Sequence, residues 1–523
     1  MPARTLMVQG TGSSVGKSLI TAALCRAFAR EGLRVLPYKS QNMSNNAAAV
    51  PGGGEIGRAQ ALQAASCRVI PTVDMNPVLL KPEGDARSQV VLLGRPWKTL
   101  SAREYHLEKD ILWAAASAAL DRLRAKADLV VIEGAGSPAE INLREDEIVN
   151  MKVARYANSP VILVGDIDPG GVFAQFVGTL ALLEPEERAL VKGLVINKFR
   201  GDISLLEPGL DFLRERCGLP VLGVLPWIRG IGLAEEDGAV LETRPRASAS
   251  SPSIGRSAVG VLDIAVIRLP RISNFDDLDA LSLEAGVSVR FVSGAEELGD
   301  PDAIVIPGTK ATLADLDWLR ERGLDLGIRW LARRGRSILG ICGGFQMLGE
   351  SIDDPDGVEG RPRRETGLGL LPLRTTFGSG KRTVPRRGRV ASGLPAALAA
   401  AGGAPVEGYE IHAGESRVEG PPLFELEAVP GIPAAGDGTW AAEGRIVGTY
   451  LHGLFDLPDF RRAWLVSIDR RGTWQGGNPK VAGIALADAR DLALDRLADA
   501  VTTSLDMDEL RRIVGLDTPK EGT

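Results

Sequence analysis

The chain is poor in cysteine, histidine and aromatic residues for its length of 523 residues. Its four cysteines stand far apart, and no pair has the CxxC spacing of a zinc knuckle or a redox motif. This disfavours a disulfide framework, and we expect a reducing, cytoplasmic setting. Because only three histidines are present, a histidine at the end of a strand is a candidate for chemistry.

Long apolar runs and clusters of basic residues are also absent. No apolar run approaches the roughly 20 residues that cross a membrane. The net charge is −6, and lysine and arginine are scattered along the chain. No polybasic segment that would favour binding to nucleic acid is therefore present. Residues 1–10 run directly into a glycine-rich loop, and we expect a first strand there and not a signal peptide. We therefore expect small-molecule partners, no nucleic acid and no membrane, and we leave room for a homo-oligomer.

What the chain does contain is a repeated alternation of short apolar runs with helical patterns. The apolar runs have almost no polar interruptions, which is typical of parallel strands covered on both faces. In the first half we expect strands at 5–8, 33–38, 128–132, 161–164, 193–196 and 221–224. We expect helices there at 17–30, 55–68, 102–126, 172–183 and 205–216.

The alternation stops at 244–257, a Ser/Pro/Arg-rich stretch without periodicity that we interpret as a linker. It then resumes with strands expected at 263–268, 288–292, 303–307 and 337–341, and an amphipathic helix is expected at 485–504. The pattern predicts two doubly wound α/β domains. Their predicted bounds are 1–243 and 258–470, with a helical extension at 471–523.

The first motif is GTGSSVGKS at residues 10–18, between an expected strand and an expected helix. Backbone N–H groups in such a loop cradle phosphate, Lys17 supplies a positive charge, and the Ser18 hydroxyl can reach Mg²⁺. A glycine-rich turn that binds nothing is the weaker alternative. A P-loop enzyme also needs carboxylates for its metal. Glu133 ends an apolar strand, whereas Glu55 is expected to open a helix, where an acid is also common for helix-dipole reasons.

The second motif is SILGICGGFQMLG at residues 337–349, an apolar strand that runs into a glycine-flanked cysteine and then a helix. This pattern predicts a nucleophile elbow with Cys342 as the nucleophile. The turn needs small neighbours, and the N-terminus of the helix favours the thiolate. Backbone N–H donors for an oxyanion hole are expected at Gly343 and at Gly308, in the turn PGTK.

A thiolate nucleophile needs a base, and His452 is our prediction because it follows an apolar strand in IVGTYLHGLFD. His412 lies in GYEIHAGES, which we also expect to be a strand end. A substrate or interface contact and a structural role are both open for it. His106 lies in the charged pattern REYHLEKD, and we expect a solvated surface residue.

Together these motifs resemble class I glutamine amidotransferases and, more narrowly, the cobyric acid synthase family. The resemblance extends in family order from residue 10 to residue 456. It implies a P-loop domain of the dethiobiotin-synthetase type, whose longer loop has Thr11 where most P-loops have glycine, fused to a flavodoxin-like amidotransferase domain. The segments that carry it are GTGSSVGKS (10–18), YKSQNMSNN (38–46), GEIGRAQALQA (54–64), MNPVLLKP (75–82), EGAGSPAEINL (133–143), GDIDPGGVFA (165–174), NKFRGD (197–202), PGTKATLADL (307–316), GICGGFQMLG (340–349), GYEIHAGES (408–416) and GTYLHGLFD (448–456).

The resemblance implies an enzyme of cobalamin biosynthesis that uses ATP, Mg²⁺ and glutamine. It would amidate the b, d, e and g side-chain carboxylates of adenosylcobyrinic acid a,c-diamide through acyl phosphates. The implied ATP-binding residues are Gly12, Ser13, Ser14, Val15, Gly16, Lys17, Ser18 and Lys39. The implied metal ligands are Ser18, Glu55 and Glu133. The implied substrate-binding residues are Asn76, Lys81, Ser137, Asn142, Glu147 and Asp166.

The chain departs from the family pattern at three positions. Triad amidotransferases have a glutamate two residues after the histidine, and here Leu454 stands there, which leaves Asp456 as a candidate to orient the imidazole. Glu147 replaces the usual aspartate before Ile-Val-Asn. Pro169 stands where the family has an arginine. The candidates to replace that arginine are Lys198 and Arg200.

Three other functions are compatible with parts of this pattern. A cobyrinic acid a,c-diamide synthase would share both domains and amidate two other carboxylates. A ParA-like switch ATPase with a vestigial glutaminase would usually have a second lysine early in its loop, where this chain has Gly12. An amidase of a cell-wall lipid precursor is disfavoured by the fusion of both domains in one chain and by the lack of membrane-binding features.

Overall fold

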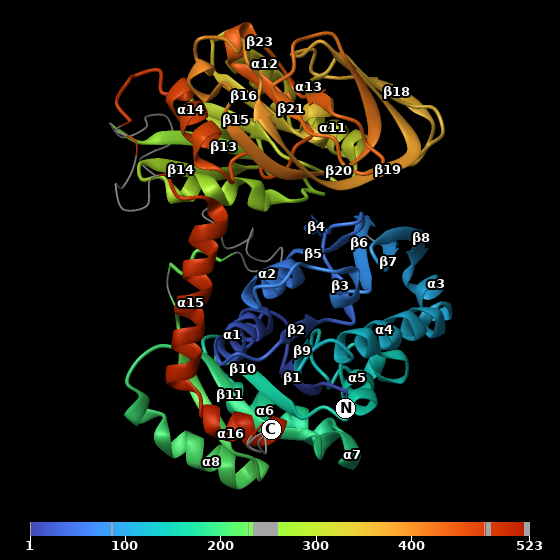
Figure 1. Cartoon of the computed structure of the whole chain (residues 1–523), viewed down its shortest axis with the longest axis vertical. Helices are drawn as coiled ribbons and strands as arrows, with labels where there is room; N and C mark the ends of the chain where they lie inside the picture. Colours follow the sequence, from blue (N-terminus) through green and yellow to red (C-terminus); the bar gives the residue numbers. More distant parts are fainter. Residues whose placement is uncertain are drawn as a thin grey trace, which may run out of the picture. The chain divides into compact units, whose positions relative to one another are not determined.

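The computed structural model describes residues 2–84, 87–228, 230–233, 260–474, 476 and 483–516, which form two compact units (Figure 1). These units do not follow the order of the chain. The first contains the described parts of Met1–Ser44, Gly54–Asp237 and Arg490–Thr523. The second contains those of Asn45–Gly53 and Gly238–Ala489. The linker predicted at 244–257 lies outside the described residues.

The first unit is built on a six-stranded parallel sheet in the order β12-β11-β10-β1-β9-β2. Side chains of one strand alternate between the two faces of the sheet. Met7 therefore belongs to one core, and its neighbours Leu6 and Val8 belong to the other. The strands are β1 (Arg4–Gly10), β2 (Val35–Tyr38), β9 (Leu129–Glu133), β10 (Val161–Asp166), β11 (Val191–Phe199) and β12 (Val221–Pro226).

Helices cover both faces of this sheet, as expected for a doubly wound fold. One core contains side chains from α4 (Lys109–Arg124), α5 (Met151–Ala157), α6 (Val172–Leu182) and α8 (Glu207–Cys217). The other contains α1 (Lys17–Arg30) together with two helices from the C-terminal end, α15 (Leu486–Ser504) and α16 (Met507–Val514). A further short helix of this unit is α7 (Pro185–Arg188).

The part of the predicted extension 471–523 that starts at Arg490 thus completes the core of the first unit. The buried residues of α15 and α16 include Leu497, Val501 and Leu510, which lie in one apolar cluster with α1 and β1. The side chain of Arg26, in α1, is fully buried and contacts Asp491 and, at 3.8 Å, Asp495. Apolar contact and this ion pair hold the distant end of the chain in this core.

A smaller sheet in the first unit has the strand order β3-β6-β7-β8. Its strands are β3 (Gln41–Met43), β6 (Val78–Gly84), β7 (Arg87–Leu92) and β8 (Arg95–Ser101). The helix predicted at 102–126 is divided at Glu108 into α3 (Ala102–Leu107) and α4. The sheet and these helices enclose a separate apolar cluster that includes Leu80, Val90 and Leu112.

The helix predicted at 55–68 begins three residues late. Residues 55–57 form the short strand β5 (Glu55–Gly57), and α2 follows at Arg58–Ser66. The backbone N–H of Glu55 donates to the carbonyl of Gly94 at 3.0 Å, and that of Gly57 donates to Asn76 Oδ1 at 3.0 Å. These contacts with distant segments hold the backbone extended, and local helix propensity does not prevail.

The second unit has a sheet in the order β14-β13-β15-β16-β24-β23, in which only the pair β23 and β24 is antiparallel. Its strands are β13 (Leu262–Ile267), β14 (Val287–Val292), β15 (Ala303–Ile306), β16 (Ser337–Ile341), β23 (Thr439–Ala441) and β24 (Ile446–Thr449). Its helices are α10 (Ala295–Leu298), α11 (Thr312–Glu321), α12 (Leu324–Arg333), α13 (Gly343–Leu348) and α14 (Pro458–Ile468).

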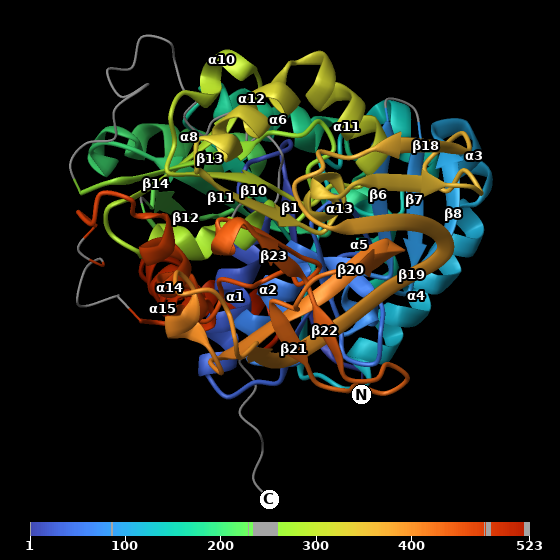
Figure 2. The same ribbon diagram turned by 90° about the horizontal axis from the view of Figure 1, so that it is seen from above.

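A second sheet of this unit was not predicted from the sequence. It is dominated by the long antiparallel pair β19 and β20, which Figure 2 shows as two extended, curved ribbons. Its strands are β17 (Ser351–Asp354), β18 (Arg363–Thr366), β19 (Leu373–Val390), β20 (Pro405–Val418), β21 (Phe424–Leu426) and β22 (Ala435–Asp437). The short strand β4 (Ala47–Ala49) also belongs to this unit.

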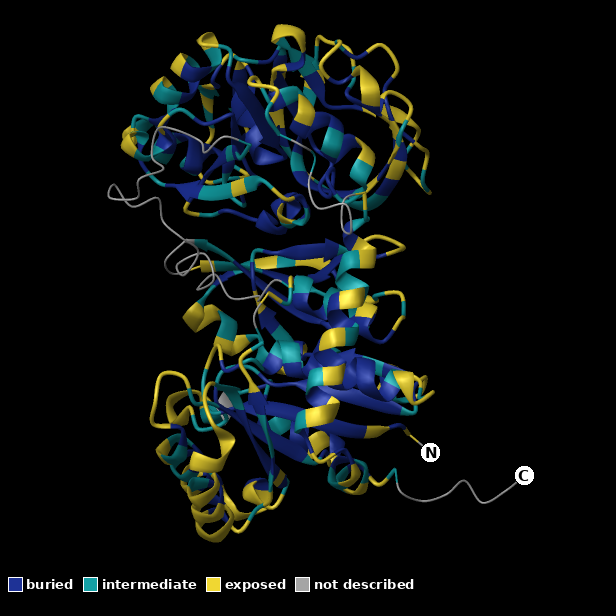
Figure 3. Ribbon diagram, turned by 90° about the vertical axis from the view of Figure 1, so that its left-hand side faces the viewer, coloured by how far each residue is buried: buried dark blue, intermediate teal, exposed yellow. Residues whose placement is uncertain are grey.

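Burial follows the architecture of each unit. In Figure 3 the strands of the central sheets are largely buried, and exposed residues gather on the outer faces of helices and on loops. Along the described ranges, no helix combines the length and the apolar character needed to cross a membrane.

Candidate active sites

The loop between β1 and α1 has the geometry of a phosphate cradle. Gly16 has a φ of 96°, and a Cβ there would lie 2.2 Å from Asn197 Nδ2, so only glycine fits. Lys17 Nζ donates to the carbonyl of Gly12 at 2.7 Å and to that of Gly136 at 3.1 Å. The lysine is therefore held over the loop, at the N-terminus of α1, where phosphate binds in P-loops.

Residues at the C-terminal end of β11 support this loop from its side. Asn197 Nδ2 donates to the carbonyl of Val15 at 2.8 Å, and Lys198 Nζ donates to that of Ser14 at 2.7 Å. Lys198 also forms an ion pair with Asp166 at 2.9 Å. Lys198 thus lies at the loop, and its role in place of the family arginine stays a prediction. The other candidate, Arg200, pairs with Asp168 at 3.1 Å and stacks on Trp227.

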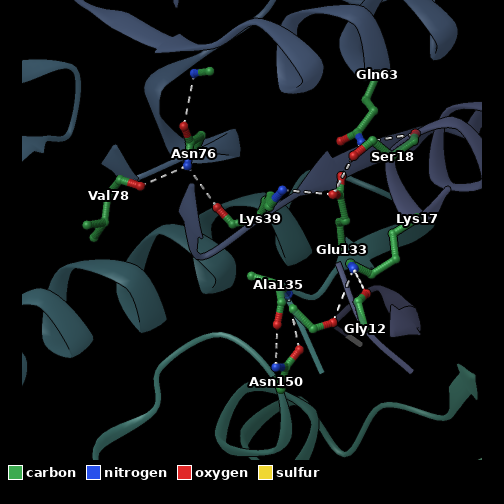
Figure 4. A network of polar contacts seen from close by, with 12 residues as sticks. Gly12, Lys17, Ser18, Lys39, Gln63, Asn76, Val78, Glu133, Ala135 and Asn150 are labelled. Atoms are coloured by element: carbon green, nitrogen blue, oxygen red, sulfur yellow. Dashed lines mark hydrogen bonds and ion pairs between the residues drawn. The ribbon is translucent and has the colours of Figure 1, made fainter. Parts of the chain in front are cut away.

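Glu133 is the centre of a buried polar network beside the loop (Figure 4). Its carboxylate accepts hydrogen bonds from Ser18 Oγ at 2.7 Å, Lys39 Nζ at 2.8 Å and Gln63 Nε2 at 2.5 Å. Burial alone would raise the pKa of Glu133, but the charge of Lys39 and these hydrogen bonds hold its pKa below the usual value. Glu133 is therefore ionised.

A cavity of about 170 Å³ opens onto this network. It is lined by Ser13, Ser14, Gly16, Lys17, Ser18, Leu19, Lys39, Asn42, Met43, Ala59, Leu62, Glu133, Ala135 and Gly136. Most of the predicted ATP-binding residues are in this set. Gln63 was missed by the sequence analysis, because an amide within a helical pattern gives no local signal of a contact with a distant strand.

Of the three predicted metal ligands, the structure brings together two. Ser18 and Glu133 are in direct contact, whereas Glu55 is fully buried in an ion pair with Lys81, at 2.6 Å. Within the described ranges no cluster of three or more His, Cys, Asp or Glu side chains is present. One hydroxyl and one carboxylate nevertheless fit Mg²⁺, which usually keeps waters and phosphate oxygens as its other ligands. The ammonium group of Lys81, which was predicted to bind substrate, is paired with the carboxylate of Glu55.

The remaining predicted substrate residues shape the loops around this site. Asn76 is buried, and its side chain bonds to the backbone of three segments, through Gly57 N–H, Lys39 C=O and Val78 C=O. The hydroxyl of Ser137 accepts from the N–H of Ala139 at 3.2 Å. The Glu147 carboxylate accepts backbone N–H bonds at the start of α5, from Val149, Asn150 and Lys152. Asn142 is exposed, in a 3₁₀ helix at Ile141–Asp146.

In the second unit, Cys342 stands at a sharp turn between β16 and α13. Its φ of 53° and ψ of −110° are unusual for a residue with a side chain. A Cβ on Gly344 would lie 1.9 Å from the carbonyl oxygen of Ile306, so the turn requires glycine there. The thiol donates to the carbonyl of Ile411 at 3.4 Å. This is the predicted nucleophile elbow.

His452 lies beyond β24 and is completely buried. Its Nδ1 donates to Asp277 Oδ2 at 2.7 Å, and Asp277 Oδ1 accepts from the N–H of Gly453 at 2.9 Å. Burial disfavours the imidazolium, but the charge and hydrogen bond of Asp277, together with Cys342, raise the pKa of His452 to about 10. The side chain that orients the imidazole is therefore Asp277. The backbone N–H of Asp456, the candidate from the sequence, instead donates to the carbonyl of Gly453 at 2.8 Å.

The two glycines expected at an oxyanion hole converge on this site. A Cβ on Gly308 would lie 3.0 Å from His452 Cε1, and one on Gly343 would lie 2.7 Å from Thr309 Cγ2. The turn at Gly308 is fixed because its carbonyl accepts from the N–H of Ser273 at 2.9 Å.

The other two histidines differ from His452 in their surroundings. His412 is in the middle of β20, not at a strand end, and its ring stacks on Tyr450 at 3.9 Å. Burial and the charge of Arg382 lower the pKa of His412 to about 3, so it is neutral and cannot serve as an acid near pH 7. His106 is exposed, in α3, as expected.

Comparisons with known proteins match both halves of the chain. Residues 6–241 match the family described as CobQ/CobB/MinD/ParA nucleotide binding domain, and residues 263–460 match the CobB/CobQ-like glutamine amidotransferase domain. A cobyric acid synthase of Sorangium cellulosum is 53% identical, over 99% of this chain and 100% of its own length. The chain belongs to the cobyric acid synthase family. Other members of this family from Desulforudis audaxviator and Dehalococcoides mccartyi are 52% and 50% identical, over 99% and 98% of this chain and 100% and 99% of their own length.

A solved glutamine amidotransferase structure is similar over 39% of this chain and 98% of that chain, at 19% identity and a TM-score of 0.29. At such a score it adds no weight to the fold, which rests on the sheet topology and the family matches.

Proposed function

We propose that this protein uses glutamine and ATP to amidate the b, d, e and g carboxylates of adenosylcobyrinic acid a,c-diamide, by way of acyl phosphates. The observation that carries the proposal is the presence of two complete constellations in one chain of the cobyric acid synthase family. One is the cysteine elbow with its buried His452–Asp277 pair. The other is the phosphate loop with Lys17 beside the ionised Glu133.

The second unit supplies the chemistry of a glutaminase. The Cys342 thiolate attacks the side-chain amide carbon of glutamine, and the backbone N–H groups near Gly308 and Gly343 stabilise the oxyanion. The His452 imidazolium, held by Asp277, donates its proton to the leaving nitrogen, so ammonia departs and a thioester remains. Water then hydrolyses the thioester to glutamate.

The first unit supplies the ATP-driven step. The phosphates of ATP would rest on the loop, and Lys17 would exchange its carbonyl partners for phosphate oxygens. Ser18 and Glu133 would hold Mg²⁺, which neutralises charge on the phosphates when bound. A substrate carboxylate oxygen attacks the γ-phosphorus, ADP leaves, and ammonia then attacks the acyl carbon and releases phosphate. Activation is needed because a carboxylate is a poor electrophile.

The same proposal covers the setting of the reaction. We propose that the protein acts in the cytoplasm, because its four cysteines form no disulfide bonds. We also propose that its partners are small molecules only, because the reaction consumes a corrinoid, glutamine and ATP. It includes the capacity to form a homo-oligomer.

The number of amides formed tests the substrate assignment. Adenosylcobyrinic acid a,c-diamide incubated with the protein, ATP, Mg²⁺ and glutamine should gain four amides, because four free carboxylates are available. Mass spectrometry of the corrinoid measures this number directly, and a reaction without ATP is the control. A product of cobyrinic acid with two added amides, and no reaction of the a,c-diamide, would show instead a cobyrinic acid a,c-diamide synthase.

A further inference from the structure

The first unit contains a larger cavity, of about 480 Å³, that none of the predicted ATP-binding residues lines. It lies against the β3-β6-β7-β8 sheet, with α3 and the segment around residues 143–149 as its other walls. Its lining is mainly apolar and includes Leu80, Pro82, Val90, Leu100 and Leu143.

Strand β3 connects this cavity with the phosphate cavity. Successive side chains of a strand point to opposite faces. Accordingly, Asn42 lines the phosphate cavity and Gln41 lines the larger one. Met43 lines both, and 61% of its surface is exposed. The two cavities therefore meet at the exposed side chain of Met43.

The charged groups of the larger cavity suit an anionic ligand. Arg87 and Lys109 line it, and they come from β7 and from the start of α4. Among the described lining residues the acidic one is Glu147, and its carboxylate already accepts three backbone N–H bonds at the start of α5. The negative charge of Glu147 is thus balanced within the protein by these N–H groups at the start of α5.

We propose that this cavity binds the corrin macrocycle, whose apolar ring lies against the β3-β6-β7-β8 sheet while one peripheral carboxylate reaches past Met43 to the γ-phosphate of ATP. The basic residues would contact the other carboxylates. This inference rests on the proposed function and names the site for its substrate.

The chemistry of the lining fits a substrate with four reactive side chains. Each carboxylate must in turn reach the same phosphate, so the ring must bind in several orientations. Apolar contact is not directional and tolerates such changes, whereas a wall of hydrogen-bond donors would select one orientation. Long basic side chains can follow the displaced carboxylates, because Lys and Arg carry their charge on flexible stems.

Binding of a corrinoid to the full-length protein tests this site without turnover. The probe is cobyrinic acid a,c-diamide with cyanide as the cobalt ligand, titrated without ATP or glutamine and followed by corrin absorbance. Leu143→Asp and Arg87→Glu place negative charge at the cavity and should each weaken binding about tenfold or more. Matched controls are Ile141→Asp, in the same 3₁₀ helix and 54% exposed, against 47% for Leu143, and Arg95→Glu, in the neighbouring strand. Neither control residue lines the cavity.

The outcomes separate this inference from the function on which it rests. Corrinoid affinity that is the same in the cavity variants and their controls overturns the cavity assignment. Loss of ATP binding by Leu143→Asp overturns it as well, because the residue would then act through the fold or the phosphate loop. If the unaltered protein does not bind the corrinoid at all, the proposed function itself is wrong.

Discussion

At the scale of single residues, the protonation state of His452 decides the glutaminase chemistry. A buried histidine is normally neutral, because desolvation disfavours its charge. Here the Asp277 carboxylate, at 2.7 Å, and the neighbouring Cys342 reverse that effect and raise the pKa of His452 to about 10. The imidazolium therefore persists at neutral pH, beside a cysteine that must act as thiolate, and its proton is ready for the departing ammonia.

Asp277→Asn tests this arrangement. The substitution removes the charge that raises the pKa of His452, so the pKa falls and the imidazolium is lost at a lower pH. We expect the alkaline limb of kcat/KM for glutamine to move toward neutral pH, with kcat lowered on the order of 100-fold. The pH profile of glutamate release measures both effects.

Asp277→Glu is the matched control, since it keeps the charge and should retain an alkaline limb well above that of the asparagine variant. A residue that only supports the fold would lower activity without moving the profile. An alkaline limb at the same pH in all three proteins would therefore contradict the role given to Asp277.

Residue patterns revealed the parts of both sites that lie within one continuous motif. Cys342 and Lys17 were predicted because a strand, a tight turn and a helix follow one another in the sequence. Asp277 and Gln63 were not, because they reach their partners, His452 and Glu133, across 175 and 70 positions of sequence. A pair of aspartates soon after a strand, at 276 and 277, was the one local signal for the former.

At the scale of elements, the segment Asn45–Gly53 belongs to the second unit, whereas the residues before and after it in the chain belong to the first. Asn46 Oδ1 accepts from the N–H of Asn274 at 2.8 Å, and Asn274 Oδ1 accepts from the N–H of Ala47 at 3.0 Å. Asn274 has a φ of 51°, and its Nδ2 lies 3.5 Å from His452 Nε2. Only six residues separate Lys39, beside Glu133, from Asn46 in the chain.

Asn46→Ala should therefore disturb glutamine hydrolysis although the residue lies in the N-terminal part of the chain. It removes the acceptor that helps to hold Asn274 in a left-handed conformation beside His452. A hydrogen bond of this kind is worth about 0.5–1.5 kcal/mol, so we expect glutaminase kcat to fall about two- to tenfold. Ammonia-dependent amidation should be unchanged, and comparing the two rates measures the effect.

Pro51→Ala, at an exposed position of the same segment, is the control and should leave both rates unchanged. Equal losses of the glutamine-dependent and ammonia-dependent rates in Asn46→Ala would show that the segment merely supports folding.

Elements were predictable where their period is regular and their partners are close in sequence. The parallel strands of both central sheets were expected near their observed positions, because short runs of consecutive apolar residues are typical of strands covered on both faces. The helix expected from residue 55 does not begin there, because Glu55 forms a buried ion pair with Lys81. The sequence around residue 55 cannot reveal a contact with so distant a residue. The sheet of β17–β22 was missed because β19 and β20 are rich in charged and small residues and lack a continuous apolar run.

At the scale of the whole molecule, two reactions with opposite needs are joined in one chain. Ammonia must be generated next to a stable imidazolium, yet it must react as the neutral amine. An acyl phosphate must form where water is scarce. Dividing these tasks between two units, each with its own core, meets both needs. The C-terminal helices, which bury residues such as Val501 against α1 and β1, make the first unit depend on both ends of the chain.

The most direct test of this division is amidation by Cys342→Ala with two nitrogen sources. Glutamine-dependent amidation of the corrinoid should vanish, because the thioester cannot form. Amidation with ATP and a high concentration of ammonium salt should remain near the rate of the unaltered protein, whereas Lys17→Ala should abolish both. Loss of the ammonium-dependent reaction in Cys342→Ala, to the same degree as the glutamine-dependent one, would contradict the account.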